Sequence, residues 1–387
     1  MASPFDLTPV LRIALLGLAL ATGPLAWVWL RHRGIGPAAR LSALTWLTLF
    51  LTFDLVLFGA FTRLTDSGLG CPDWPGCYGN ASPLGAQSQI DAAQAAMPSG
   101  PVTHHKAWIE MVHRYLATGV GLLIIVLVIE SWSQARRGRA AVSPWWATAT
   151  LLWVCAQGAF GALTVTMKLY PAIVTAHLLG GLGLLALLAA QSRADGHAPL
   201  ALSPRLVHGA WAVWAVVLAQ VALGGWVSTN YAVLACSDFP TCQGAWWPDM
   251  DLRHGFTLLR PLGIGHDGGA IPFQALTAIH VVHRIGAAVV VIAVGLLAWR
   301  LAATREPAAS RFAQGLVAVV AWQFASGLGN VVLGWPLAAA VAHTGGAAAL
   351  LTLLTLLLAR ARQARRSAQP APPLRSPRTA STASGAP

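Results

Sequence analysis

The sequence predicts an all-α integral membrane protein with about nine transmembrane helices. Hydrophobic residues make up 56% of the 387-residue chain and charged residues only 10%, whereas soluble domains carry about 25% charged residues. The apolar residues gather in stretches of about twenty, the length that crosses a bilayer as a helix. Several motifs also occur twice along the chain, which predicts two related helical halves.

Nine apolar stretches define the predicted spans. They lie at about 9–30, 41–62, 109–132, 144–166, 171–190, 206–228, 275–299, 312–334 and 336–359. Arginines concentrate in the connections near 31–40, 133–143, 191–205 and 300–311 and in the C-terminal tail. Because short basic loops remain in the cytoplasm, we expect the C-terminus there and the N-terminus outside.

The net charge of +12 does not indicate a nucleic-acid partner. The basic residues fall between apolar segments and in the tail, and they form no basic face interleaved with aromatic residues. Such a distribution is typical of loops that set membrane topology. The partner that this composition predicts is the lipid bilayer.

An internal repeat divides the chain. "GAFTRLTDSGLGCPDWPGCYG" (59–79) aligns without gaps on "GGWVSTNYAVLACSDFPTCQG" (224–244), and "EMVHR" (110–114) corresponds to "HVVHR" (280–284). Each half is entered from the cytoplasm, which predicts parallel repeats about an axis along the membrane normal. We therefore expect an extra N-terminal helix (1–40), two tandem pseudo-symmetric four-helix bundles (41–190 and 206–359) and a disordered cytoplasmic tail (360–387).

Four histidines inside the spans follow the repeat. They are His113 and His177 in the first half and His283 and His343 in the second. At about 1.5 Å per residue, all four lie roughly 6–12 Å below the outer helix ends. Two imidazoles on facing helices at one depth can bind a haem iron axially. A single buried histidine is equally explained as a strut between helices, but duplicated pairs favour haem. Zinc is disfavoured, since no third His or Cys has a ligand spacing.

Other ionisable residues accompany these histidines. Glu110 lies three residues before His113 on the same helical face, and ionisable groups within a membrane need a partner, water or a ligand. At the position of Glu110 the second half has His280, so only the first half carries a carboxylate there. Arg114 and Arg284 directly follow histidines and are predicted to contact haem propionates, with snorkelling to the membrane surface as the alternative.

Small residues follow the histidines, in "GVGLL", "LLGGLG" and "HTGGAAA". They would let a porphyrin face approach the backbone, although close helix packing explains them equally well. Cys155 stands alone within a span and is interpreted as an apolar filler.

At "TRLTDSGLGCPDWPGCYG", "EMVHRYLATG", "GALTVTMKLYPAIVTAHL", "HRIGA" and "AVAHTGG" the chain closely resembles the haem A synthase family of the proteobacterial type. The resemblance covers about residues 41–359 and both halves in order. It implies an oxidoreductase of the bacterial cytoplasmic membrane that oxidises the C8 methyl of haem O to a formyl group. Its product, haem A, would serve the assembly of cytochrome c oxidase.

The resemblance also implies the roles of the sites. His283 and His343 would hold a haem b cofactor, and His113 and His177 would hold the substrate haem O. Glu110 corresponds to the family's essential glutamate beside the substrate. We expect its carboxylate to stabilise positive charge at the oxidised methyl or to take up its proton.

Alternatives exist for one ligand. His280 shares a helical face with His283 and is an alternative ligand to it. The "HR" dipeptide, present in both halves and in the family, favours His283.

The two long outer loops each carry a cysteine pair at the same spacing. In an oxidising periplasm we expect the disulfides Cys71–Cys77 and Cys236–Cys242, which for such short loops stabilise by about 2–3 kcal/mol at most. The resemblance suggests that the first pair exchanges with a partner thiol, and simple loop stapling is the alternative. Further expected partners are the haem O synthase (a farnesyltransferase), a thiol or quinone electron partner, and a second copy of the chain.

The alternative function is that of a di-haem b membrane cytochrome transferring electrons to or from quinone. All four histidines would then hold permanent haem b, and Glu110 would handle protons. A transporter fits less well, because no span is broken midway by a Gly/Pro pair. One permanent haem and one exchangeable, chemically altered haem would indicate the enzyme.

Overall fold

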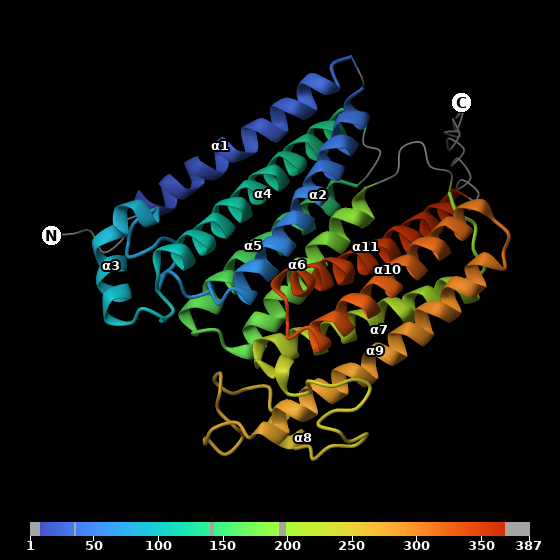
Figure 1. Cartoon of the computed structure of the whole chain (residues 1–387). Coiled ribbons are helices and arrows are strands. Elements are labelled where there is room, and N and C mark those ends of the chain that lie inside the picture. Colours follow the sequence, from blue (N-terminus) through green and yellow to red (C-terminus); the bar gives the residue numbers. More distant parts are fainter. Residues whose placement is uncertain (1–7, 35, 140–142, 193–198, 368–387) are drawn as a thin grey trace, which may run out of the picture.

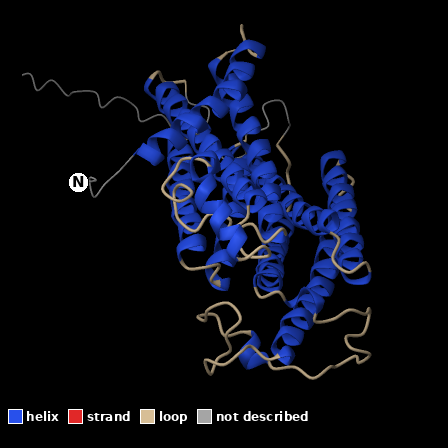
Figure 2. Cartoon of the chain, turned by 60° about the vertical axis from the view of Figure 1, so that its left-hand side comes forward, coloured by secondary structure: helices blue, strands red, loops and turns tan. Residues whose placement is uncertain are grey.

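The computed structural model describes residues 8–34, 36–139, 143–192 and 199–367, and all regular elements in these residues are helices (Figures 1 and 2). Nine of the described helices are long and apolar enough to cross a membrane. They are α1 (Thr8–Arg31), α2 (Pro37–Leu64), α4 (His104–Arg136), α5 (Pro144–Thr166), α6 (Pro171–Gln191), α7 (Pro204–Thr229), α9 (Phe273–Ala302), α10 (Pro307–Val332) and α11 (Leu337–Ser367). The shorter elements are η1 (Pro83–Ala86), α3 (Gln87–Ala96), η2 (Ala232–Leu234) and α8 (Leu252–Gly255). The prediction of an all-α membrane protein with about nine spans is confirmed.

The helix ends follow local sequence rules. Five of the long helices begin at a proline. Proline lacks a backbone N–H, and N–H groups in the first turn of a helix have no acceptor within the helix, so no hydrogen bond is lost there. α4 instead begins after Thr103, whose hydroxyl accepts a hydrogen bond from the Lys106 amide. Within α2, Thr48 and Thr52 donate to carbonyls of their own helix at 2.7 and 2.6 Å. These hydroxyls therefore need no water inside the apolar core.

Eight of the long helices form two groups of four. α2, α4, α5 and α6 pack in a ring, and α7, α9, α10 and α11 repeat this order (Figure 1). Between the groups, α6 packs on α7 and α11, and α11 also packs on α2. Equivalent helices thus exchange equivalent contacts, as expected for halves related by a two-fold axis. A continuous cluster of buried leucines, valines and alanines runs through both groups.

The connections between α2 and α4 (residues 65–103, the first cysteine loop) and between α7 and α9 (residues 230–272, the second cysteine loop) repeat each other. Cys71 is bonded to Cys77 and Cys236 to Cys242, as the sequence predicts. In the first loop the Asp73 carboxylate accepts the amides of Tyr78 and Gly79, and in the second the Asp238 carboxylate accepts those of Gln243 and Gly244. Hydrogen bonds from the Thr241 hydroxyl and the Gly244 amide lower the pKa of Asp238 to about 2. Asp238 is therefore a fixed anion at the centre of its turn.

The extra helix α1 lies outside both rings and packs along α4 (Figure 1). Gly17 permits this approach, since a Cβ there would lie 2.5 Å from Cγ2 of Thr118. Ile13 joins a buried cluster with Cys71, Cys77 and Met111. α1 therefore supports the half that carries His113 and the first disulfide.

Two expectations differ from the structure. Cys155 is exposed on α5 and does not fill the core, because a helix in a membrane can place a small apolar side chain against lipid. The tail expected from residue 360 starts later, since α11 continues to Ser367. Arginine is a good helix former, so the basic segment after residue 359 extends the helix. Residues 368–387 of the expected disordered tail lie outside the described residues.

We predict that Gly17→Leu separates α1 from α4. Overpacking at such a contact costs about 1–3 kcal/mol, and Thr118 leaves no room for a larger side chain. Thermal unfolding of the purified protein should shift downward, and hydrogen exchange of residues 71–80 should accelerate. Gly23→Leu on the same helix is the control, because a Cβ at Gly23 meets no atom within 4 Å. Equal behaviour of both variants would show that this packing does not matter.

Candidate functional site

The four repeated histidines lie inside the two helix rings. His113 on α4 and His177 on α6 come from opposite corners of the first ring, and His283 on α9 and His343 on α11 come from opposite corners of the second. Within each pair the imidazoles are close enough to interact electrostatically. The structure therefore brings together the pairs expected from the sequence, one in each half.

A glycine from a neighbouring helix lies against each of the four imidazoles. Measured from a Cβ built on the glycine, the distances are 3.1 Å for Gly59 to His113 Nε2, 3.4 Å for Gly161 to His177 Cε1, 3.0 Å for Gly224 to His283 Cε1 and 3.2 Å for Gly327 to His343 Cε1. These glycines occupy equivalent positions on α2 and α7 and on α5 and α10. Any larger side chain would displace the ring, so each glycine reserves the space that the imidazole occupies.

The glycines that follow the histidines in sequence have a different role. A Cβ on Gly180 or Gly346 would overlap the amide of Gln157 or Gln323, and a Cβ on Gly345 would lie 2.7 Å from Leu57. These glycines accommodate side chains of adjacent helices. Close helix packing therefore explains Gly180, Gly345 and Gly346, and the approach of a porphyrin to the small residues stays a prediction.

Both histidines of the second pair have a side-chain partner at Nδ1. His343 Nδ1 lies 2.9 Å from Oγ of Ser326, and that hydroxyl donates to the Trp322 carbonyl at 2.8 Å. His283 Nδ1 lies 3.0 Å from the amide nitrogen of Gln220, which also donates to the His283 carbonyl at 2.9 Å. The sequence motifs did not indicate Gln220 or Ser326. A comparison of the two halves beside each repeated glycine could have found them.

The first pair is held differently. His177 Nδ1 is buried and has no hydrogen-bond partner among the described residues. The His113 ring stacks on Phe58, with 6.3 Å between centroids and 9° between planes. Neither imidazole of this pair has a side-chain hydrogen bond within the part of the chain that the structure describes.

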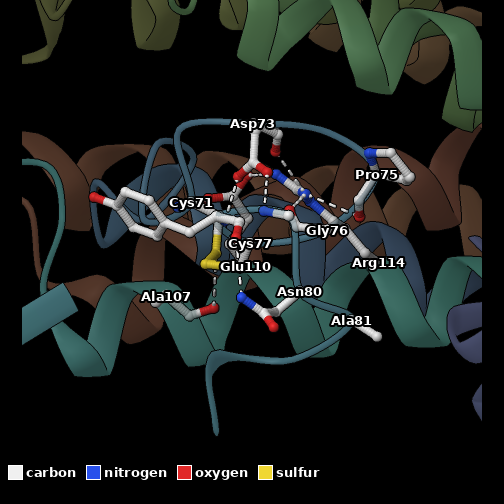
Figure 3. Close-up of a disulfide and its surroundings, with 12 residues drawn as sticks. Cys71, Asp73, Pro75, Gly76, Cys77, Asn80, Ala81, Ala107, Glu110 and Arg114 are labelled. Atoms are coloured by element: carbon white, nitrogen blue, oxygen red, sulfur yellow. Dashed lines mark hydrogen bonds and ion pairs between the residues drawn. A yellow bond between two sulfur atoms is a disulfide. The ribbon is translucent and has the colours of Figure 1, made fainter. Parts of the chain in front are cut away.

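Glu110 faces the first cysteine loop rather than lipid. Its side chain is buried, and Oε2 accepts the Cys71 amide at 2.8 Å (Figure 3). Oε1 forms an ion pair with Arg114, one turn further along α4. Because each carboxylate oxygen can accept two hydrogen bonds, capacity remains for a further donor. His280, at the aligned position, is also buried, and its Nδ1 has no partner in the described residues.

Arg114 and Arg284 hold the cysteine loops against the histidine-bearing helices. Arg114 donates to the carbonyls of Asp73, Pro75 and Gly76 at 2.6–3.1 Å (Figure 3). Arg284 donates to the carbonyls of Thr241 and Cys236 at 2.8 and 3.1 Å. Charged donors make stronger hydrogen bonds than neutral ones. The contact to haem propionates stays a prediction for both residues.

The residues present fit a haem iron between each pair of histidines. No group of three or more His, Cys, Asp or Glu that could hold a metal occurs among the described residues, so the metal donors available inside the rings are paired imidazoles. Two imidazoles from opposite helices supply the axial donors that bis-histidine haems use. When the Ser326 oxygen accepts from Nδ1–H of His343, Nε2 is free for a metal.

Known proteins resemble this chain over most of its length. Residues 42–355 match the family COX15-CtaA, described as cytochrome oxidase assembly protein. The heme A synthase of Shewanella oneidensis is 39% identical over 325 residues, which cover 80% of this chain and 93% of the relative. The heme A synthase of Chelativorans sp. is 30% identical over 327 residues (77% and 84%). That of Allorhizobium ampelinum is 28% identical over 329 residues (79% and 86%).

We predict that Arg114→Gln loosens the first cysteine loop and leaves the second unchanged. The variant loses several charged hydrogen bonds to loop carbonyls, each worth about 1.5–3 kcal/mol. Hydrogen exchange of residues 71–80 should rise by at least tenfold, as measured by mass spectrometry. Arg284→Gln is the matched control and should loosen residues 236–244 alone. Unchanged exchange in both variants would contradict the anchoring role.

Proposed function

Because the chain belongs to the COX15-CtaA family of cytochrome oxidase assembly proteins, we propose that it is a haem A synthase. This membrane oxidoreductase converts haem O to haem A, and we infer that it oxidises the C8 methyl to a formyl group. One observation carries the proposal in the structure: two equivalent histidine pairs occur, and only the first has a buried carboxylate one turn away. A protein that only transfers electrons would not need this difference.

We assign the two haems to different halves. His283 and His343 would hold the haem b cofactor, and His113 and His177 would hold the substrate haem O. A haem b bound there supplies one-electron redox chemistry. The protein would contribute the histidine ligands, the glycines that leave space for their imidazoles, and apolar helices that exclude water.

Glu110 is the residue that we assign to the chemistry. Its carboxylate is fixed by the Cys71 amide and by Arg114, so it needs little reorganisation when charge develops nearby. It lies on the face of α4 that carries His113. From there it would stabilise positive charge at the substrate methyl or accept its proton.

We also propose an orientation in the bacterial cytoplasmic membrane. The arginine-rich connections lie at the end opposite the cysteine loops, which supports periplasmic loops and a cytoplasmic C-terminus. There the first disulfide would meet a thiol or quinone partner or serve as a staple of the loop. The haem O synthase, a farnesyltransferase, would deliver the substrate, and a second copy of the chain is a further partner.

Glu110→Gln should abolish turnover and leave haem binding intact. The amide keeps the shape of the side chain but removes its charge, and a loss of about 100-fold or more is expected for a group of this kind. Haems would be extracted with acid from protein co-expressed with a haem O source and separated by chromatography. Glu130→Gln, near the other end of α4, is the control. Normal haem A production by the Glu110 variant would refute the catalytic role.

Variants of the histidines should separate the two haems. Removing one of two imidazoles would weaken the binding of the haem that the pair holds. His343→Ala should therefore lose haem b. His113→Ala should keep haem b and fail to retain haem O or haem A. Haem chromatography and reduced-minus-oxidised spectra of the purified proteins distinguish the two results. Two equivalents of haem b and no other haem in the unmodified protein would support the di-haem b cytochrome.

A further inference from the structure

The two histidine pairs differ in what holds their rings. Building on the proposed function, we propose that Gln220 and Ser326 are positioning residues that retain the cofactor haem in the second half. At the equivalent places the first half has Leu55 and Phe160. This difference makes the first half a site that releases its haem.

The equivalence of these positions rests on the glycines that touch the imidazoles. Gln220 precedes Gly224 by four residues, as Leu55 precedes Gly59 on α2. Ser326 directly precedes Gly327, as Phe160 directly precedes Gly161 on α5. Each glycine lies against a histidine of its own half. The match of Gln220 to Leu55 and of Ser326 to Phe160 therefore rests on these contacts and does not need overall sequence similarity.

Ser326 holds the ring of His343 through Nδ1. The serine oxygen lies 2.9 Å from Nδ1 and 2.8 Å from the Trp322 carbonyl oxygen. When the hydroxyl donates to this carbonyl, its oxygen accepts from Nδ1–H, and Nε2 keeps a free lone pair. A metal-binding histidine needs this arrangement, and such partners of the second nitrogen raise the basicity of the ligand.

Gln220 restrains His283 by a second kind of contact. Its amide lies 3.0 Å from Nδ1 and donates to the His283 carbonyl, which ties it to the ring and to the backbone of the same residue. Its Oε1 is buried and has no partner among the described residues. In this orientation the amide nitrogen donates to Nδ1, whereas a metal at Nε2 needs the ring proton on Nδ1. When a metal binds Nε2, the amide must therefore turn so that Oε1 accepts from Nδ1–H, in exchange for its bond to the His283 carbonyl.

Leu55 and Phe160 cannot provide such bonds, since their side chains carry no polar atom. The consequence is visible at His177, whose buried Nδ1 has no partner in the described residues. His113 is restrained by stacking on Phe58 and by contact with Gly59. A synthase must release its product and keep its cofactor. The halves differ at the atoms that control how firmly each ligand is held.

The test measures haem retention in the purified full-length protein, independently of turnover. Loss of a hydrogen bond to a metal-binding histidine weakens binding by about 10–100-fold. Transfer of haem b to apomyoglobin should therefore accelerate about tenfold or more in Ser326→Ala and in Gln220→Leu, and further in the double variant. The midpoint potential of the haem should rise in these variants, because a less basic imidazole stabilises the ferric state less. Ser326→Thr keeps the hydroxyl and should restore both values.

Two controls separate positioning from general stability. Thr355→Ala, on the helix that carries His343, removes a buried acceptor of the Trp214 indole N–H at 3.0 Å, and it should leave haem transfer and potential unchanged. The reverse exchange, Leu55→Gln with Phe160→Ser, should slow the release of haem O from protein loaded with haem O. A serine variant that behaves like Thr355→Ala would overturn the proposal.

The failure of this inference is distinguishable from that of the proposed function. If His343→Ala retains its haem b, the assignment of the cofactor to the second half is wrong. If His343→Ala loses haem b while Ser326→Ala and Gln220→Leu transfer haem at the unmodified rate with an unchanged potential, only the positioning role is wrong.

Discussion

An imidazole inside a bundle of apolar helices needs a partner for each polar edge, and the rest of this structure follows from that constraint. In the apolar interior of a membrane protein, a ring nitrogen without a metal or a hydrogen-bonding group costs free energy. In each helix ring the two histidines lie on opposite helices, and a glycine on a neighbouring helix leaves space for each imidazole. Four such corner positions, two in each half, set the spacing of α2, α4, α5 and α6 and of their counterparts.

The cysteine loops are attached to the histidine helices by one basic side chain each. Arg114 and Arg284 follow His113 and His283 directly, and both donate to loop carbonyls close to a disulfide. In the first half this attachment includes Glu110, which accepts the Cys71 amide. The disulfide and the carboxylate are therefore connected, and a change in the first loop would reach the proposed reaction site through the Cys71 amide and through Arg114. In the second half that connection is missing, since His280 replaces the carboxylate.

The sequence predicted the spans, the repeat, the histidine pairs and the disulfides because each is recorded in local composition or spacing. A run of twenty apolar residues has few alternatives to a membrane helix, and a duplicated "HR" with a duplicated cysteine pair marks equivalent positions. The glycines against the imidazoles were not predicted, because Gly59 and His113 lie far apart in sequence and meet only when α2 packs on α4. For the same reason the sequence left two explanations open for the glycines after the histidines, and it did not show which side chains pack on them. Gly180 faces Gln157, and no helical period shows which adjacent helix a residue meets.

Residues that differ between otherwise equivalent halves are the most informative part of this chain. A duplicated scaffold retains what both copies need: the disulfide turn, the arginine, the histidine and the glycine that touches it. Three exchanges fall beside the paired histidines, namely Glu110 for His280, Leu55 for Gln220 and Phe160 for Ser326. The first exchange places a carboxylate in the first half only. The other two exchanges place side-chain hydrogen bonds to the histidines in the second half only. Under the proposed function, the half with a carboxylate and without side-chain hydrogen bonds to its histidines would react and release, and the half with these hydrogen bonds and without a carboxylate would hold its haem. The same fold can thus serve both tasks through differences at a few side chains, without any change in the path of its helices.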